Sequence, residues 1–491
     1  MSLILLRALL LWLASGICFA TALSGSYLLP SNESFHGLLN LTHKNSTIQE
    51  AERLIAAAVE QQSIYNAFRV ANPRRNNYRH DPKPNSSKLR RDSYDGPAPP
   101  SLNETVLAAA ALIAEVDALS QLANGTYNND TRLASQILET LTPSDHGKRH
   151  AEADGYWLPE LSGDGLPPMG YDSSYPVLRV VTDAKYGAKG DGVTDDTKAI
   201  NAAIADGNNC GKNCLSSSVK GTLIYFPPGT YLISSPINAY YYSQLVGDAN
   251  NRPTIKTSPR FIGLGAIQTD VYNPGASGDE WYIEQSVFYR QVRNFIIDIR
   301  DTRTGSVAGL HWQVAQATSL TNVAVIASRD TSSRNKQMGM FTENGSGGFM
   351  SDVTLSGGAY GIYGGNQQYT VRDFIIDGQT KACINLIWDW GWTWSRLTLS
   401  NAPVGISLIN PEQTTGQVAG STYVMDSRFI GISTGIYAEF NKTVLDSSII
   451  TLDNIGAENV NRMIGFSDGS HLDIPADSVD FVVVGDVAVT I

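Results

Sequence analysis

Charged residues are scarce in this chain. Asp, Glu, Lys and Arg make up 17% of its 491 residues, and acidic side chains outnumber basic ones to give a formal net charge of −11. A protein that binds nucleic acid needs a dominant basic surface, so this balance excludes that class of partner. An uncharged polymer is a better match to this charge balance as a binding partner. Glycine, by contrast, is abundant with 44 residues, as expected for a chain with many tight turns.

Cysteine and histidine are also rare, with four and seven residues. Only His311 and His471 lie beyond residue 155, which is too few ligands for a metal centre, and we expect no metal and no cofactor. In an oxidising compartment, Cys210 and Cys214 are expected to close a small surface loop as a disulfide. Cys383 has apolar neighbours on both sides and is expected to be a buried thiol rather than a nucleophile.

No apolar run beyond the amino terminus reaches the roughly 18 residues of a membrane-spanning helix. At the amino terminus, Arg7 precedes a short apolar run, and the small residues around Ala20 offer a cleavage site. This pattern predicts a secretory signal peptide over residues 1–20. We therefore expect a secreted, monomeric protein, extracellular or in the cell wall, with no membrane contact after cleavage.

Residues 21–155 differ in composition from the rest of the chain. Helical periodicity over residues 48–68 and 105–122 predicts two helices, and the Pro-, Asn-, Ser- and Arg-rich segment 73–100 predicts a linker. The pair Lys148-Arg149 is either a processing site or a solvated charge pair. We interpret this partly helical, partly disordered region as a glycosylated candidate propeptide. The Asn-x-Ser/Thr sequons, expected to carry surface glycans, are at Asn32, Asn40, Asn45, Asn85, Asn103, Asn124 and Asn129 here and at Asn344 and Asn441 further on.

The second unit, residues 156–491, begins with a strand, a glycine-rich turn and a short helix. In Val181–Ala205, Gly190 and its glycine neighbours permit left-handed turns. The Asp195-Asp196 pair offers oxygens to the free N–H groups of a helix start. An apolar face around Ile200 then predicts a helix that covers a core. The phosphate-loop pattern GxxxxGK[ST] is absent, and an ordinary strand–loop–helix is the alternative.

A weak internal repeat follows this segment. Short β-branched or aromatic runs after a polar residue recur in steps of 20 to 32 residues, at Phe295, Val323, Val353, Phe374, Leu397, Phe429 and Ile449. Periods of this size indicate a solenoid whose coils bury apolar faces by stacking. A doubly wound α/β fold would need about ten helical residues per crossover, and a β-propeller a more regular step of about 40–50 residues. The sequence therefore predicts an all-β, single-stranded parallel β-helix.

Function on such a fold must lie on the lateral surface of the solenoid. Three turn segments, 311–318, 341–348 and 364–369, are rich in amides, hydroxyls and aromatic rings. Stacked in register, they would form one polar strip suited to sugar hydroxyls, which need both donors and acceptors. The alternative is ordinary turn structure with Asn stacking. In segment 388–394, tryptophans at every second position would share one strand face, either as an exposed binding platform or as core.

These motifs together resemble a known family. The segment YGAKGDGVTDDTKAI resembles the opening of pectate-lyase-like right-handed parallel β-helix proteins. LIYFPPGTYLISSPI, HWQVAQATSL, ENGSGGFM, GNQQYTVR and IWDWGWTW are similar to the fungal β-1,3-glucanases of glycoside hydrolase family 55, over a region from about Tyr156 to Asp446. The resemblance implies inverting hydrolysis of laminarin-type glucan, which needs a carboxylic acid and an activated water.

The resemblance also implies roles for individual residues. Gln316 and Ser346 match positions that place the attacking water. The residues expected at sugar subsites are Trp312, Gln367, Trp390 and Trp392, with Glu343 in the same strip in a secondary role. In the family the general acid is a Glu on a second β-helix, and only one YGAKGDG-type opening occurs here, so we expect this acid to be missing.

The sequence therefore predicts a secreted glycoside hydrolase of β-1,3-glucan, whole or degenerate, with a polysaccharide partner. A non-catalytic protein that binds β-1,3-glucan or the cell wall is the alternative. A pectin-degrading enzyme is disfavoured, because the NTD, GHG and RIK elements of polygalacturonases are absent, as is an acidic cluster for calcium.

Overall fold

The computed structural model describes residues 45–72, 96–124, 156, 158, 174–273, 280–303, 305–409, 419–438, 449–472 and 478–485. The predicted signal peptide, Lys148-Arg149 and the sequons at Asn32, Asn40, Asn85, Asn129 and Asn441 lie outside these residues. The domain boundaries drawn from composition stay predictions.

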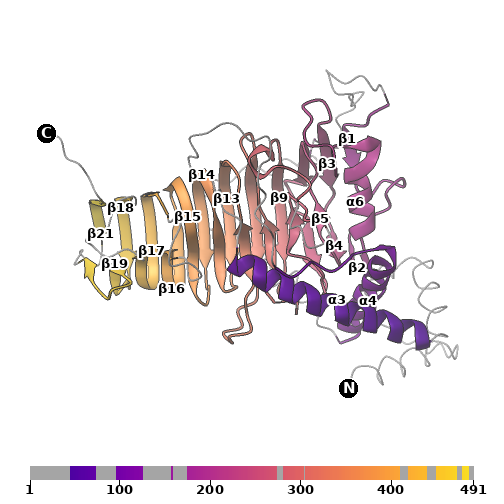
Figure 1. Ribbon diagram of the computed structural model, residues 1–491, viewed down its shortest axis with the longest axis horizontal. Coiled ribbons are helices and arrows are strands. Elements are labelled where there is room, and N and C mark those ends of the chain that lie inside the picture. Colours follow the sequence, from indigo (N-terminus) through magenta and orange to yellow (C-terminus); the bar gives the residue numbers. More distant parts are fainter. Residues whose placement is uncertain are drawn as a thin grey trace.

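Two long helices precede a series of short and long strands (Figure 1). The helices are α3 (Asn45–Ala71), α4 (Glu104–Ala123) and α6 (Thr197–Ala205), with short 3₁₀ turns η2 (Asp206–Asn208) and η3 (Glu284–Ser286). The strands are β1 (Leu178–Val180), β2 (Asp191–Asp195), β3 (Thr222–Phe226), β4 (Thr230–Ile233), β5 (Ile237–Asn238), β6 (Ser243–Gly247), β7 (Thr254–Thr257), β8 (Gly265–Gln268), β9 (Gln291–Asp298), β10 (Ala308–His311), β11 (Ser319–Ile326), β12 (Met338–Thr342), β13 (Gly348–Ser356), β14 (Tyr360–Asp377), β15 (Ala382–Ser395), β16 (Thr398–Leu408), β17 (Ser421–Ala438), β18 (Ile449–Glu458), β19 (Arg462–Phe466), β20 (His471–Leu472) and β21 (Ser478–Val484).

The strands stack in parallel as the coils of a β-helix, which confirms the predicted fold. Val323 pairs in register with Phe295 on one side and Val353 on the other, and Val353 pairs with Phe374. The predicted repeat therefore matches the coils in this region. Toward the C-terminal end the alignment was wrong. Phe429 pairs with Leu399 rather than Leu397, and Ile449 pairs with Ser421, because the strands there are long and carry several apolar positions.

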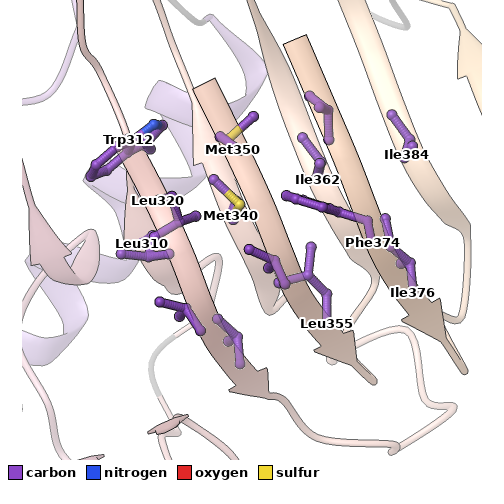
Figure 2. Close-up of a cluster of buried hydrophobic side chains, with 14 of the residues drawn as sticks. Leu310, Trp312, Leu320, Met340, Met350, Leu355, Ile362, Phe374, Ile376 and Ile384 are labelled. Carbon is purple, nitrogen blue, oxygen red and sulfur yellow. The ribbon is translucent and has the colours of Figure 1, made fainter. Parts of the chain in front are cut away.

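Side chains that point inward form the core of the coil. Figure 2 shows Leu310, Met340 and Ile362 side by side, from the paired strands β10, β12 and β14, and all three are fully buried. Each coil alone would leave this face exposed to water, so burial depends on stacking. Cys383 is a buried free thiol in the same core, as expected.

One corner of the coil is marked by residues in the left-handed conformation. They have φ between 50° and 64° and are Asn294, Asn322, Asp352, Asp373, Arg396, Asp426 and Asn454. The Nδ2 of Asn322 donates to Oδ1 of Asn294 at 2.9 Å, and the Nδ2 of Asn454 donates to Oδ1 of Asp426 at 2.7 Å. Asn and Asp tolerate this conformation better than most residues. The corner therefore holds neighbouring coils in register by side-chain bonds.

The opening segment covers the N-terminal end of the coil, as predicted. Ile200 and Ile204 of α6 are fully buried in the core. Oδ1 of Asp195 accepts the N–H of Thr197 in the first helical turn at 2.8 Å. Asp196 is the N-cap residue but makes no side-chain cap bond; its carboxylate accepts the N–H groups of Lys189 and Gly190 instead. Asp195 therefore caps the helix, and Asp196 stabilises the glycine-rich turn before it.

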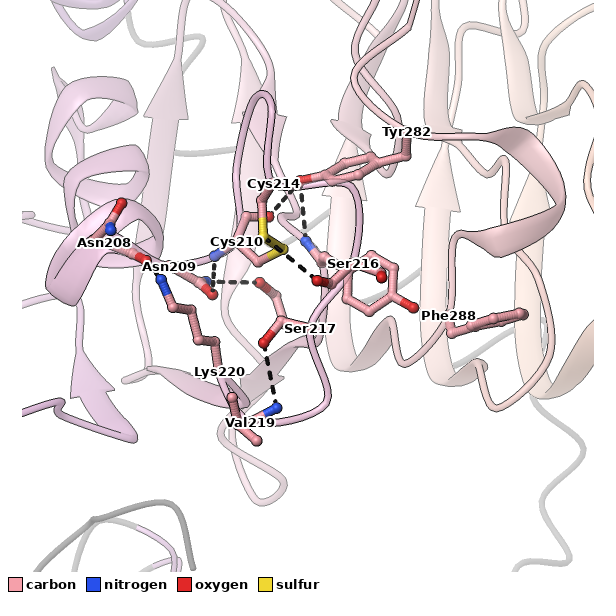
Figure 3. Close-up of a disulfide and its surroundings, with 12 residues drawn as sticks. Asn208, Asn209, Cys210, Cys214, Ser216, Ser217, Val219, Lys220, Tyr282 and Phe288 are labelled. Atoms are coloured by element: carbon pink, nitrogen blue, oxygen red, sulfur yellow. Dashed lines mark hydrogen bonds between the residues drawn. A yellow bond between two sulfur atoms is a disulfide. The ribbon is translucent and has the colours of Figure 1, made fainter. Parts of the chain in front are cut away.

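The predicted disulfide between Cys210 and Cys214 is present beside this cap (Figure 3). Cys210 is fully buried, and its backbone carbonyl accepts the hydroxyl of Tyr282 at 2.7 Å. The disulfide loop is thereby attached to the segment that follows β8. At the opposite end, β21 pairs with β18 in antiparallel orientation, which ends the parallel ladder.

The two predicted N-terminal helices are confirmed and lie against the side of the coil (Figure 1). Ile55 of α3 and Ile113 of α4 pack with Ile262 of the β-helix, and Ala118 of α4 packs with Leu232. By length and composition α4 is apolar enough to cross a membrane. Here its small residues form one face against α3 and the first coils. The sequons at Asn103 and Asn124 lie exposed at its two ends.

Candidate functional site

Four of the predicted site residues form one column across four neighbouring coils. The bridge between Val314 and Gly345 fixes the first two coils, and Ser346 bonds to Gln316. On the next coils Gly348 pairs with Tyr369, and Asn366 and Gln368 pair with Asp389 and Gly391. Gln316, Ser346, Gln367 and Trp390 therefore follow one another, and we call them the exposed column.

The contact between Gln316 and Ser346 is the best-defined part of this column. The Ser346 hydroxyl lies 2.8 Å from Oε1 of Gln316 and 3.0 Å from the carbonyl oxygen of Gln285, and it can donate to one of them at a time. Gln316 is exposed, whereas Ser346 is buried. Gln316 thus presents its carboxamide at the surface with the Ser346 hydroxyl bonded beneath it, and the two groups together can hold a water by both donation and acceptance.

Two glycines fix the position of Ser346. Gly345 has φ +129°, and a Cβ there would lie 2.0 Å from the carbonyl oxygen of Val314. Gly347 has φ +105°, and a Cβ would lie 2.3 Å from the carbonyl oxygen of Gln368. Side chains at either position would push this turn away from its neighbours, so the ENGSGG sequence is needed to seat the serine.

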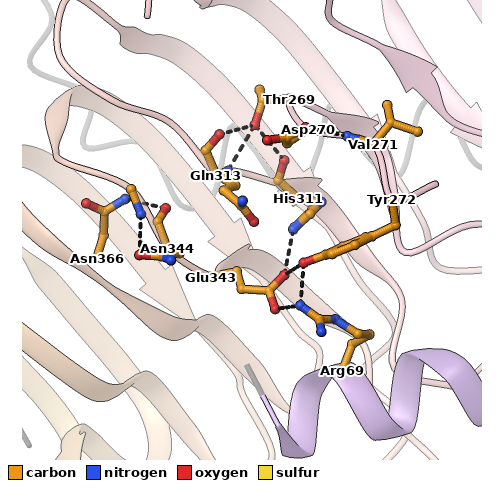
Figure 4. Close-up of polar contacts among 11 residues, drawn as sticks. Arg69, Thr269, Asp270, Val271, Tyr272, His311, Gln313, Glu343, Asn344 and Asn366 are labelled. Atoms are coloured by element: carbon orange, nitrogen blue, oxygen red, sulfur yellow. Dashed lines mark hydrogen bonds and ion pairs between the residues drawn. The ribbon is translucent and has the colours of Figure 1, made fainter. Parts of the chain in front are cut away.

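Glu343 lies on the same coil as Ser346 but is fully buried (Figure 4). Its carboxylate accepts bonds from the Arg69 guanidinium and the Tyr272 hydroxyl, and it lies 3.2 Å from Nε2 of His311. Burial alone would raise the pKa of Glu343, but the charge of Arg69 and the hydrogen bonds from His311 and Tyr272 outweigh it and lower the pKa to about 2. The side chain is therefore ionised at neutral pH.

Arg69 belongs to α3, in the region interpreted as a candidate propeptide. Its side chain is only 2% exposed, and its guanidinium lies 4.3 Å from the ring centroid of Tyr272. Sequence reasoning did not identify Arg69 or Tyr272. Arg69 lies one residue past the predicted helix 48–68 and 274 positions from Glu343, and no local pattern reports a contact over that distance.

The tryptophan segment does not form the predicted platform. Trp390 is 52% exposed, but Trp388, Trp392 and Trp394 are 0–1% exposed. The change from the outer side to the core falls between Trp390 and Trp392, so strand alternation does not hold along the whole segment. Trp388 joins an outer apolar cluster, while Trp392 and Trp394 stack in the core with ring centroids 5.0 Å apart.

Trp312, Trp392 and Asn344 do not have the exposure that their predicted roles require. Trp312 is fully buried in the core of the coil (Figure 2), so Trp312 and Trp392 cannot lie at sugar subsites in this structure. Asn344 is 1% exposed, and its Oδ1 accepts the N–H of Gly345 at 2.8 Å. A glycan at Asn344 would not fit this fold. Gln367 stays in the exposed column, although only 7% of its surface is exposed.

Two buried carboxyl groups near the strip were also not predicted as site residues. Asp389 is 1% exposed and accepts the N–H of Gly420; burial raises its pKa to about 7, although backbone N–H groups partly offset this. Asp270 is fully buried, and burial raises its pKa as well. Within the described ranges, no three His, Cys, Asp or Glu side chains are grouped as metal ligands.

Comparisons with known proteins identify the relatives of this chain. Residues 179–407 match the family model described as rhamnogalacturonase A/epimerase, pectate lyase-like. The chain is 41% identical over 309 residues to a probable glucan endo-1,3-beta-glucosidase of Arthroderma benhamiae, covering 62% of this chain and 34% of that protein. It is 38% identical over 316 residues to a glucan 1,3-beta-glucosidase of Cochliobolus carbonum, covering 63% and 39%. A third relative is the non-secreted LysM effector LysM19 of Penicillium expansum, 42% identical over 354 residues, covering 71% and 27%.

These relatives confirm the resemblance to pectate-lyase-like proteins and fungal β-1,3-glucanases that the motifs indicated. The chain carries a pectate-lyase-like β-helix and is homologous to proteins named as glucan 1,3-β-glucosidases. The matched region spans between 27% and 39% of the length of these relatives.

Proposed function

We propose that this protein is a glycoside hydrolase that acts on β-1,3-glucan, with its water-placing groups in the exposed column. The observation that carries the proposal is the contact between Ser346 and Gln316, 2.8 Å long, on the lateral surface of a pectate-lyase-like coil. The identity of about 40% to proteins named as glucan 1,3-β-glucosidases supports the substrate class.

In this proposal Gln316 and Ser346 hold the attacking water. An inverting glycosidase needs a water on the face of the sugar opposite the leaving oxygen. The carboxamide oxygen of Gln316 and the hydroxyl oxygen of Ser346 accept hydrogen bonds from that water and turn its lone pair toward the anomeric carbon. As the new C–O bond forms and the glycosidic bond breaks, the proton of the water passes to solvent, and positioning by the two groups lowers the entropic part of the barrier.

Trp390 and Gln367 continue the column beyond the water. An exposed indole offers a flat apolar surface for the C–H face of a sugar ring, and the carboxamide beside it offers one donor group and one acceptor. Trp390 is 52% exposed in a part of the coil where the other tryptophans are buried. We therefore assign sugar stacking to Trp390 and hydroxyl binding to Gln367.

Glu343 does not supply the proton for the leaving oxygen in this state. Its carboxylate is ionised at neutral pH, since its pKa is lowered to about 2, and Arg69 and Tyr272 occupy its oxygens. A general acid must be protonated near the working pH. The leaving group therefore has to receive its proton from a carboxyl group outside the polar strip, as the family resemblance implies.

A second candidate function is glucan binding without hydrolysis. The burial of Glu343 under α3 favours it, because the strip then offers no ionisable group in reach of a sugar. Binding through Trp390 and Gln367 would remain. The two candidates differ only in turnover, so one assay separates them.

The test uses the full chain, and it measures reducing-sugar release from laminarin beside pull-down on insoluble β-1,3-glucan. The hydrolase proposal expects turnover that falls at least about 100-fold in Gln316→Ala and Ser346→Ala, with pull-down retained. Gln291→Ala and Ser319→Ala are matched controls, because these residues also pair across neighbouring coils but lie outside the column. Retention of β-configuration in the first product, read by NMR, would contradict the inverting mechanism. Pull-down without turnover would leave only the binding function.

We also propose that the protein is secreted. The signal-peptide pattern over residues 1–20 supports this, and so does the disulfide between Cys210 and Cys214, because such bonds persist in oxidising compartments. Immunodetection in culture medium and in washed cell wall, against a cytosolic marker, tests it. Accumulation of the uncleaved chain inside the cell would overturn it.

A further inference from the structure

A second row of residues runs beside the exposed column on the outer face of the coil. His311 pairs with Gln268 on one side and Phe341 on the other. Asp270, Gln313 and Glu343 each follow the last residue of one of the paired strands β8, β10 and β12 by one or two positions and therefore lie on neighbouring coils. The next pairings, of Phe341 with Tyr363 and of Gly365 with Trp388, extend the line. We call this line the buried row, and its members are Asp270, Gln313, Glu343, Gly365 and Trp388.

Polar atoms in the buried row lack partners. Oδ2 of Asp270, both amide atoms of Gln313 and Nε1 of Trp388 are buried and have no hydrogen-bond partner, and all three residues are 0% exposed. Each such atom costs about 1–3 kcal/mol, and native proteins keep few of them. Similar atoms occur elsewhere in the described coils, but those of the row lie on neighbouring coils, where one ligand would complete their bonding.

The chemistry of the row matches a polyhydroxy ligand. Asp270 and the Gln313 oxygen accept hydrogen bonds, while the Gln313 nitrogen and the Trp388 indole donate them. Sugar hydroxyls need both kinds of partner. Trp388 adds an aromatic ring, which reaches over Gly365, since a Cβ on that glycine would lie 2.6 Å from the ring. The row thus combines an aromatic surface with donors and acceptors in the way of a sugar-binding site.

The N-terminal helix α3 covers this row. Arg69 bonds to Glu343 in its middle, and Val70 packs against the outer cluster that contains Trp388. Figure 4 shows this Arg69 contact. Asn66, one turn earlier, donates to the carbonyl oxygen of Gly263 at 2.8 Å. The last turns of α3 therefore cover the part of the buried row around Glu343 and Trp388.

The contacts of α3 differ between its two halves. Its first half is held by apolar residues such as Ile55 and Ala58, packed on α4 and Ile262. Its second half combines the buried polar residues Asn66 and Arg69 with Tyr65, whose ring centroid lies 5.9 Å from that of Tyr272, and with Val70. Polar contacts exchange with water at a small net cost, and a buried ion pair adds little net stability. The second half can therefore separate while the first stays docked.

A cavity lies next to the covered row. It measures about 530 Å³ and is lined by Gln62 and Tyr65 of α3 and by Gln268 and Tyr272 of the β-helix. The seam between α3 and the coil thus contains open space beside Tyr272, the residue that bonds to Glu343. Close packing is normal for a permanent interior, so the open seam favours a contact that is made and broken.

We propose that the buried row is a latent subsite for β-1,3-glucan and that α3 is its intramolecular blocker, with Arg69 bound to Glu343 as the latch. This inference rests on the proposed function. Glu343 and Ser346 are three residues apart in one turn, at most about 10 Å even for an extended chain, so a short glucan held in the exposed column reaches the row. Binding of glucan hydroxyls to Asp270, Gln313 and Trp388 displaces the second half of α3.

The test compares laminarihexaose binding and hydrogen exchange in full-length variants. Arg69→Met removes the latch, and the double variant Arg69→Met/Glu343→Gln removes it without leaving a buried charge, in case the single variant does not fold. Arg53→Met is the matched control, because Arg53 lies on the same helix in an exposed pair with Glu50. We expect the latch variants to bind laminarihexaose at least tenfold more tightly than the native chain and the control. In the native chain, laminarihexaose should lower amide protection in residues 62–71 and leave residues 51–58 unchanged.

Two outcomes separate this inference from the proposed function. If the native chain binds laminarihexaose, but the latch variants bind with the same affinity and α3 keeps its protection, the latent subsite is wrong and the glucan function stands. If neither the native chain nor the latch variants bind, the glucan function is wrong and the inference fails with it. Gln313→Leu, added to the double variant, should abolish the gain in affinity; a gain that persists would place the new contacts elsewhere.

Discussion

The hydroxyl of Ser346 lies 2.8 Å from the carboxamide oxygen of Gln316, across two neighbouring coils of the β-helix. The two residues are 30 positions apart in the chain, one full coil. Their meeting depends on the bridge between Val314 and Gly345, which sets the height of one turn over the other. The chemistry proposed for the column is therefore tied to backbone geometry in the turn that carries Ser346.

Gly345→Ala tests this dependence directly. The new Cβ would lie 2.0 Å from the carbonyl oxygen of Val314, at a backbone φ of +129°. Strain of this kind costs about 1–3 kcal/mol, and it moves Ser346 away from Gln316. We expect a lower urea midpoint and a loss of laminarin turnover as large as that of Ser346→Ala. Gly305→Ala is the control, since nothing lies within 4 Å of its Cβ; equal effects from both would contradict the argument.

Substitutions of two tryptophans in β15 should affect glucan binding and stability differently. Trp392→Ala deletes a core ring and should cost about 3–5 kcal/mol of unfolding free energy. Trp390→Ala removes a side chain that is 52% exposed, so its stability should change by less than about 1 kcal/mol. Pull-down on insoluble β-1,3-glucan should show the reverse order, with binding lost in Trp390→Ala. Unchanged pull-down in that variant would remove Trp390 from the binding surface.

Asp389 predicts a pH dependence of stability. Burial raises its pKa to about 7 in the folded state, against about 3.9 in the unfolded chain. The folded form therefore binds the proton more tightly than the unfolded chain. Below about pH 4 the titration of Asp389 does not reduce the free energy of unfolding, and as pH rises toward 7 it reduces that free energy progressively. Asp389→Asn keeps an acceptor for the N–H of Gly420 and cannot ionise. Urea unfolding from pH 4 to 8 should show a smaller loss in the variant, and parallel curves would contradict the assignment.

Local patterns were enough to predict the fold. Glycines and apolar positions in Val181–Ala205 identified the end cap, and the recurrence from Phe295 to Phe374 identified the coils, because both signals lie within a few residues of each other or repeat at a fixed step. The exposed column was predictable for the same reason, since stacking places turn residues such as Gln316 and Ser346 in line.

Other features depended on information that a single segment does not carry. Alternation predicted one face for all four tryptophans, but the strand changes face between Trp390 and Trp392. Trp392 packs in the core and Trp390 points outward, a change that no local pattern in the segment reports. The contact of Arg69 with Glu343 joins an N-terminal helix to the middle of the coil. It is set by how the helix docks, and the residues around Arg69 in the sequence give no sign of it.

The ion pair between Arg69 and Glu343 makes α3 docking sensitive to acid. The pKa of Glu343 is lowered to about 2 in the folded chain, against about 4.3 in an unfolded one. Its contribution to stability is therefore present above about pH 4 and is lost as pH falls toward 2. Glu343 faces Arg69 of α3, His311 of β10 and Tyr272 after β8, and Glu280 also acts on the charge of Arg69. Glu343→Gln should be less stable than the native chain at pH 7, because the buried Arg69 loses its directly bonded carboxylate, and the gap should close between pH 4 and 2. Urea unfolding at each pH measures it, with Glu50→Gln as the exposed control; a gap that is constant with pH would show that the carboxylate charge does not hold the helix.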